Sequence, residues 1–177
     1  MDRRDEVLDF WFGLAPDQWW KPDATLDEGI RRRFAELWEE ERENVPEHFL
    51  GSAKDALAAV VLFDQFPRNM FRGQADQFST DPLALAVAKG AVDRGYDEQL
   101  GPAERAILYM PFQHSEKIDD QRRSLLLFTA LGDPHHLGYA RKHHDVIARF
   151  GRFPHRNAIL GRAPRADEVA AGDVVPW

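Results

Sequence analysis

Apolar residues recur along this chain with the period of an α-helix, and no segment alternates apolar and polar residues as a strand does. The clearest case lies between residues 23 and 44, where one helical face carries Leu26, Ile30, Phe34, Leu37 and Trp38. No Asn-Gly or Asp-Gly pair marks a hairpin turn. The chain is therefore predicted to be all-α, with about seven to nine helices packed as antiparallel hairpins in a single domain over residues 1–177.

Local signals set the expected helix limits. Ser52, with Asp55 at capping-box spacing, begins a helix that should end at Phe66, because proline disfavours helical geometry in the residue before it. An Asp-Pro pair at 81–82 and another at 133–134 read as an N-cap followed by proline at the first helical position. Trp19 and Trp20 are expected to fill the core. The predicted helices cover the DEVLDFWFG segment, 23–44, 52–66, 82–94, 102–110, 117–131, 134–151 and a short stretch after Pro164.

Composition narrows the class of protein. The chain has 177 residues, 44% of them hydrophobic, and no cysteine, which excludes disulfides and thiolate chemistry and favours a cytoplasmic location. Its longest apolar run, residues 56–63, is far below the roughly 20 residues that a membrane span requires. The net charge of −7 argues against nucleic acid as a partner.

Two stretches of the chain share an unusual pattern. Residues 63–73 read FDQFPRNMFRG and residues 150–162 read FGRFPHRNAILGR. Each runs Phe-x-x-Phe-Pro, then Arg-Asn, then apolar residues, then a glycine beside an arginine. Six of the 7 histidines lie at or after position 114, near the second stretch. Arginine binds carboxylate or phosphate with two parallel hydrogen bonds, and histidine can move a proton near neutral pH.

Three expected helices each place one polar residue in an apolar stripe. These residues are Asp64, Gln121 and His143. A buried carboxylate must be hydrogen-bonded or paired, and the arginines of the two stretches are candidate partners for Asp64. Between the helices, Ser115 is a candidate cap, which would put His114 and Glu116 at a helix N-terminus, where backbone N–H groups favour anions.

A structural role is the alternative for every one of these residues. Arginine and asparagine beyond a helix end can bond its last carbonyl groups, which have no partners within the helix. Asp64 could form a buried structural pair with Arg68 or with Arg156. A single histidine is also often a satisfied core residue.

Five segments together resemble a known family. They are VLDFWFG, LFDQFPRNMFRG, STDPLALAVAKGAV, YMPFQHSE and RFGRFPHRNAILGR, and they resemble the bacterial domain-of-unknown-function family nine-two-four over about residues 5–170. The resemblance implies an all-helical, tetratricopeptide-like fold and no established activity. The tail GDVVPW matches no family pattern, so the role of Trp177 is open. The family's motif positions fall here on Asp64, Gln65, Arg68, Asn69, Arg72, His114, Ser115, Glu116, Gln121, His143, Arg152, His155, Arg156 and Asn157.

Three classes of function fit these residues. The favoured one is a pocket for a small carboxylate or phosphate ligand, catalytic or not. Its catalytic candidates are His114, Glu116, His143 and His155, and the other motif positions would bind the ligand. The alternatives are a helical scaffold for an acidic peptide or chain terminus and, third, a metal site, for which no His-x-x-x-His spacing exists. The residues indicate no cofactor, since there is no glycine-rich phosphate loop.

The favoured hypothesis has a definite geometry. The two stretches would face each other across one pocket, each after a helix that ends at its Phe-Pro, and Asp64 would pair with Arg156.

Overall fold

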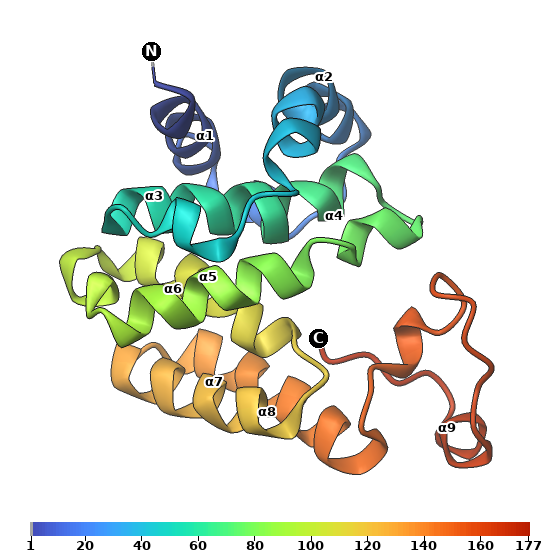
Figure 1. The fold of residues 1–177 in the computed structure, drawn as a ribbon. Coiled ribbons are helices and arrows are strands. Elements are labelled where there is room, and N and C mark those ends of the chain that lie inside the picture. Colours follow the sequence, from blue (N-terminus) through green and yellow to red (C-terminus); the bar gives the residue numbers. More distant parts are fainter. Residues whose placement is uncertain (1) are drawn as a thin grey trace. The chain divides into compact units, whose positions relative to one another are not determined.

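The computed structural model describes residues 2–177, and helices form all of its regular structure (Figure 1). No strand occurs among these residues, so the all-α prediction is confirmed. The helices are α1 (Arg3–Phe12), α2 (Ala24–Glu41), α3 (Ala53–Val60), α4 (Phe66–Met70), α5 (Asp81–Asp93), α6 (Pro102–His114), α7 (Ile118–Leu131), α8 (Pro134–Phe150) and α9 (Ala166–Ala171). Short 3₁₀ turns are η1 (Pro16–Trp19), η2 (Pro46–Phe49), η4 (Ala75–Phe78), η5 (Tyr96–Gln99) and η6 (Pro154–Arg156).

The chain forms two compact units, and the boundary falls within α6. The first unit comprises the residues up to Leu108 and the second comprises Tyr109–Trp177. The single-domain expectation stays a prediction, as does the tetratricopeptide-like arrangement. None of the helices in the described part of the chain combines the length and the hydropathy that crossing a membrane requires.

Most of the predicted helix limits are confirmed. The Ser52 hydroxyl accepts the N–H of Asp55 at the start of α3, and the Asp133 carboxylate accepts the N–H of His135 at the start of α8. Gly132 and Gly151 cap the ends of α7 and α8 in the left-handed region, at φ 79° and 70°. These limits follow from local signals because each cap bonds a backbone group within four residues of itself.

Two local predictions were wrong in the first unit. Thr80, not Asp81, is the N-cap of α5, and the carboxylate of Asp81 is instead bonded to Arg68. Trp20 does not fill the core: it is 50% exposed, because it follows a surface 3₁₀ turn. Trp19 is only partly buried and stacks on the buried Trp11, with ring centroids 6.0 Å apart.

The helix that contains the first repeated stretch does not end at Pro67. It continues from α3 through a π-helical turn, η3 (Val61–Gln65), into α4. Pro67 has no N–H to donate, and its ring would collide with the carbonyl group of Phe63 in a regular helix. The π turn widens the backbone just before the proline, and the N–H of Phe66 reaches back five residues to the carbonyl oxygen of Val61. The Thr80 hydroxyl donates to the Phe63 carbonyl oxygen at 2.7 Å.

A second proline is also accommodated within a helix. The expected end of α6 at residue 110 is wrong, because the helix passes Pro111 and ends at His114. Ile107, Leu108 and Phe112 are buried on both sides of the proline, and this packing keeps the segment helical despite one missing hydrogen bond. His114 is therefore the last residue of α6 and does not lie at a helix N-terminus.

In the second unit, α7 and α8 lie side by side (Figure 1). The short Gly132–Asp133 connection makes them an antiparallel pair, as predicted for neighbouring helices. The buried residues of α8 continue beyond its end into the second repeated stretch, so that this stretch is anchored to the helix. The cluster comprises Val146, Ile147, Phe150 and Phe153, with Ile118, Ala171 and Val174 packed against it.

Candidate functional site

The first repeated stretch ties helices together by ion pairs. Arg68 donates to both carboxylate oxygens of Asp81 at 2.9 and 3.0 Å, and lies 3.4 Å from a carboxylate oxygen of the fully buried Asp64. Burial lowers the pKa of the Arg68 guanidinium. The negative charges of Asp64 and Asp81 raise the pKa by more, so the net shift is upward. Gln65 also donates to the Asp64 carboxylate. The structural pair of Asp64 with Arg68 that the sequence suggested is thus present.

The other two polar residues of this stretch bind an acid that the sequence analysis missed. Asn69 donates to the Asp27 carboxylate at 2.8 Å, and Arg72 donates to both of its oxygens at 2.7 and 2.9 Å. Burial raises the pKa of the Asp27 carboxyl, but the bonds from Arg72 and Asn69 lower it more. Asp27 lies three residues before Ile30 in the apolar stripe of α2, the same signal that identified Asp64.

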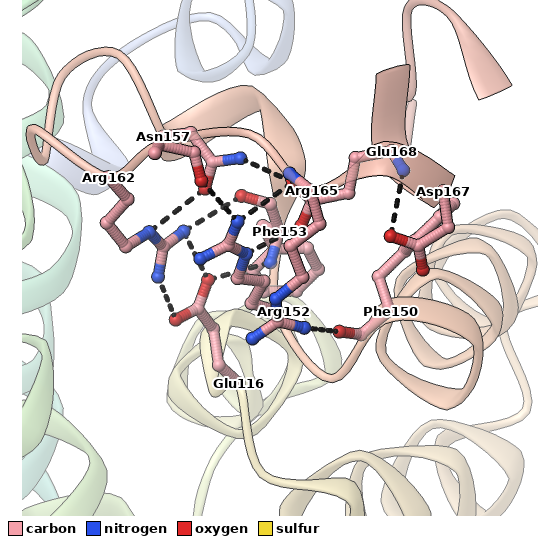
Figure 2. Close-up of polar contacts among 10 residues, drawn as sticks. Glu116, Phe150, Arg152, Phe153, Asn157, Arg162, Arg165, Asp167 and Glu168 are labelled. Atoms are coloured by element: carbon pink, nitrogen blue, oxygen red, sulfur yellow. Dashed lines mark hydrogen bonds and ion pairs between the residues drawn. The ribbon is translucent and has the colours of Figure 1, made fainter. Parts of the chain in front are cut away.

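In the second stretch, Glu116 holds the backbone that follows α8. Its carboxylate accepts the N–H of Phe153 at 2.7 Å and two bonds from Arg162 at 2.7 and 3.0 Å (Figure 2). Burial raises the pKa of the Glu116 carboxyl, and these hydrogen bonds lower it by more. Arg162 also donates to the carbonyl oxygen of Phe153. Arg162 is the arginine beside the glycine that closes the second repeated stretch, and the sequence pattern alone indicated no role for it.

Glu168, on α9, binds two further motif residues. It accepts two bonds from Arg152 at 2.6 and 2.8 Å and one from the Asn157 amide at 3.0 Å, and Figure 2 shows these groups converging. The N–H of Arg165 adds a bond at 2.8 Å. The hydrogen bond from Arg152 is the main cause that lowers the pKa of Glu168 to about 2. Arg152 and Asn157 therefore dock α9, and no helix pattern in this short segment pointed to Glu168.

Two of the catalytic candidates, His143 and His155, lie against one aromatic ring, and a third, His114, lies beside His143. We call this set the histidine cluster: His114, His143, His155, Arg156 and Phe153. The ring centroids of His114 and His143 are 6.2 Å apart, and both His143 and His155 lie 5.6 Å from Phe153. The Arg156 guanidinium carbon lies 4.6 Å from the Phe153 centroid, and its Nη2 donates to the His114 carbonyl oxygen at 3.0 Å. The second stretch and the end of α6 thus meet as the sequence suggested.

The hydrogen bond of His143 fixes the position of its proton. Its Nδ1 lies 2.8 Å from the carbonyl oxygen of Tyr139, and a carbonyl oxygen only accepts, so Nδ1 carries the hydrogen. In the neutral ring, Nε2 therefore keeps its lone pair. Burial is the main cause that lowers the pKa of His143 to about 3, and the neighbouring His114 and Arg156 lower it further.

His155 combines burial with an unused ring nitrogen. Its Nδ1 is buried and has no hydrogen-bond partner among residues 2–177. Burial first, and then the charge of Arg156, lower the pKa of His155 to about 4. At neutral pH, His143 and His155 are therefore neutral imidazoles beside the permanent cation Arg156.

Ser115 and Gln121 shape the loop between His114 and Glu116. The buried Gln121 amide donates to the carbonyl oxygens of Gln113 and Ser115, each at 2.7 Å. Lys117, not Ser115, is the N-cap of α7, and the Ser115 hydroxyl donates to Asp120 at 2.7 Å. The bonds from Gln121 hold the backbone on both sides of His114.

The two repeated stretches have different backbones. The first continues through its Phe-Pro inside a helix, and in the second α8 ends at Phe150, three residues before Phe153-Pro154. The expectation that each helix ends at its Phe-Pro is therefore wrong. The pairing of Asp64 with Arg156 across one pocket involves both units and stays a prediction. Within residues 2–177, no three histidine or acidic side chains are grouped in a way that could hold a metal ion.

The fold and the site define a helical protein in which three histidines and Arg156 lie close together at one end of the α7–α8 pair. The sequence profile of the bacterial proteins of unknown function called DUF924 matches residues 7–171, and the chain belongs to this family. It is similar to the solved structure of ATU0120, a protein of unknown function from Agrobacterium tumefaciens, with 39% identity over 95% of each chain and a TM-score of 0.87. No curated protein matches the chain.

Proposed function

We propose that this protein binds a small anionic ligand, a carboxylate or a phosphate, at the histidine cluster. The observation that carries the proposal is that His143, His155 and Arg156 lie against Phe153 and that His155 has a buried ring nitrogen with no partner among residues 2–177. His114 lies beside His143. Buried polar atoms without partners are uncommon in folded proteins and call for an explanation such as a bound ligand.

The charges around the cluster favour an anion. Arg156 contributes to lowering the pKa of both His143 and His155, which means that the free cluster resists further positive charge. A bound anion reverses this effect, because a nearby negative charge stabilises the imidazolium form. Anion binding is therefore coupled to proton uptake by His143 or His155.

Glu116, an acid beside the cluster, is itself paired with a cation. Both carboxylate oxygens of Glu116 are bonded to Arg162, and one also accepts the N–H of Phe153. This pairing with Arg162 offsets the charge of Glu116. Glu116 is then a residue that builds the site, and His143, whose Nε2 keeps its lone pair, is the group that the geometry favours for accepting a proton in any reaction there.

The test is a comparison of melting temperatures in different anions. A ligand that binds only the folded state stabilises it by about 1.4 kcal/mol at ten times its Kd, or a few degrees for a chain of this size. Phosphate, sulfate or acetate is expected to raise the melting temperature above that in chloride at equal ionic strength. His155→Ala and Arg156→Ala are expected to lose the difference.

A matched histidine variant serves as the control. His135 is exposed on α8 and lies outside the cluster, so His135→Ala should keep the full response. The proposal is wrong if the wild-type protein does not distinguish these anions from chloride, or if His155→Ala responds as the wild type does.

A further inference from the structure

An open groove lies along α1, within the first unit. Its volume is about 560 Å³, which is within the usual range of binding clefts. Residues three or four apart on a helix share one face, and one such face of α1 contributes most of the lining. The lining comprises Asp5, Leu8, Asp9 and Phe12 of α1, with Lys54 of α3 and Glu104 of α6. All of these residues lie outside the histidine cluster.

The groove carries an excess of negative charge. Glu104 is ion-paired with Lys54, so its charge is offset. Asp5 lies 3.2 Å from Arg4, but that arginine also pairs with two other carboxylates. Asp9 is exposed, and its carboxylate makes no hydrogen bond or ion pair with the described residues, 2–177. Two acids on successive turns of α1 therefore line the groove without full compensation.

The rest of the α1 face in the groove is apolar. Leu8 is buried, and Phe12 is partly buried and packs edge-on to Trp19, with ring centroids 5.8 Å apart. Apolar surface beside acids suits the side chains of lysine and arginine, because their methylene stems cover apolar groups while the charge stays at the edge. Arginine fits better, since its guanidinium can pair with a carboxylate through two bonds and can also stack on an aromatic ring.

We propose that the groove binds an extended segment of a partner protein that contains Arg-x-Arg. Asp5 and Asp9 are four residues apart, which is about 6 Å along a helix axis. Alternate side chains of an extended chain point the same way and are about 6.6 Å apart. Two arginines on either side of one residue can therefore reach both acids together. The net charge of −7 also favours a basic partner.

The test compares two capped peptides of equal composition and charge, acetyl-Arg-Ala-Arg-amide and acetyl-Arg-Arg-Ala-amide. Adjacent side chains of an extended peptide point to opposite sides, so only the first peptide can place both arginines on the acids. We expect it to bind about twofold to fivefold more tightly, the contribution of one exposed ion pair, and to bind more weakly as salt is added. NMR titrations of the full chain measure both affinities and locate the shifted amide signals.

Variants assign the binding to the groove. Asp9→Asn should weaken the binding of Arg-Ala-Arg about twofold to fivefold and remove its advantage over the isomer. Lys54→Gln leaves Glu104 uncompensated and should strengthen binding. Asp76→Asn makes the same chemical change at another exposed acid of the first unit, outside the groove, and should leave the affinity unchanged.

Each outcome decides one part of the proposal. Tighter binding of Arg-Ala-Arg that Asp9→Asn weakens, with shifts confined to the groove, supports it. Equal affinities of the two peptides would overturn the Arg-x-Arg assignment. Binding of neither peptide, or full binding by Asp9→Asn, would show that the groove is not the site. The anion site is tested with other ligands and variants, so it stands or fails separately.

Discussion

The hydroxyl of Thr80 donates a 2.7 Å hydrogen bond to the carbonyl oxygen of Phe63, the group that faces Pro67 one turn along the helix. The same hydroxyl oxygen accepts the indole N–H of Trp38 at 3.1 Å. A residue that begins α5 thus replaces the helical bond that proline cannot make, and it satisfies a buried tryptophan as well. This contact explains why the chain remains helical through the first repeated stretch.

Thr80→Val is expected to destabilise the protein by about 1–3 kcal/mol, because the similarly shaped valine leaves both the Phe63 carbonyl and the Trp38 indole N–H without this partner. Thr80→Ser keeps the hydroxyl and should recover most of the loss. Urea unfolding measures both variants. Equal stability of the valine and serine variants would show that the hydrogen bonds contribute nothing.

The two arginines of the first stretch should differ in their contribution to stability. Arg68→Met leaves the fully buried Asp64 and the carboxylate of Asp81 without this cation, and we expect a loss of about 3–5 kcal/mol. Arg72 is half exposed, and Asp27 keeps its bond from Asn69, so Arg72→Met should cost about 1 kcal/mol or less. Denaturant titrations of the two variants give the comparison, and a reversed order would contradict it.

The buried His143 should make stability depend on pH. Its pKa is about 3 in the folded protein, below the ordinary 6.5, so the unfolded chain binds the proton more readily. The free energy of unfolding therefore falls as the pH drops from about 6.5 towards 3, by at most roughly 1.4 kcal/mol per pH unit for one such group.

His143→Gln is expected to reduce this dependence between pH 7 and pH 5, a range above the ordinary titration of carboxyl groups, while His155, whose pKa is lowered to about 4, keeps its own contribution to the slope. Urea unfolding at several pH values measures the slope. Arg149→Gln, on the exposed face of α8, changes a side chain that does not titrate there and should keep the wild-type slope. An unchanged slope in His143→Gln would show that this histidine does not cause the dependence.

Glu168 should control the docking of α9. Glu168→Gln weakens the bonds to Arg152 and Asn157, so trypsin should cleave more rapidly after Arg162 and Arg165. Because the pKa of Glu168 is lowered to about 2 from an ordinary 4.5, docking in the wild type is complete above pH 4.5 and is lost as the pH falls towards 2. Asp173→Asn removes an exposed acid nearby and should leave the cleavage rate unchanged.

Calorimetry tests the single-domain prediction. If the two compact units unfold together, one transition is expected, and both Thr80→Val and Glu168→Gln should lower its temperature, although each lies in a different unit. Two transitions, each shifted by only one of the variants, would show that the units are separate domains.

Local sequence determined the helical class and most helix limits, because these depend on groups a few residues apart. Ser52 caps α3, Asp133 caps α8, and Gly132 adopts the left-handed conformation that ends α7. The apolar period identified the buried faces, and it also identified Asp64, Gln121 and His143 as polar residues within them. The family could likewise be named from five short motifs.

Tertiary structure alone decided which polar residues are structural. Phe63, Arg72 and Arg152 find their partners in Thr80, Asp27 and Glu168, at separations of 16 to 45 residues that no local rule relates. The two repeated stretches consequently have different backbones. In the first, the Thr80 hydroxyl bonds the Phe63 carbonyl oxygen that Pro67 cannot bond, and the helix continues. In the second, Gly151 ends α8 before the Phe-Pro pair is reached. The sequence supplies the same side chains twice, and the groups that fold against them determine what each copy does.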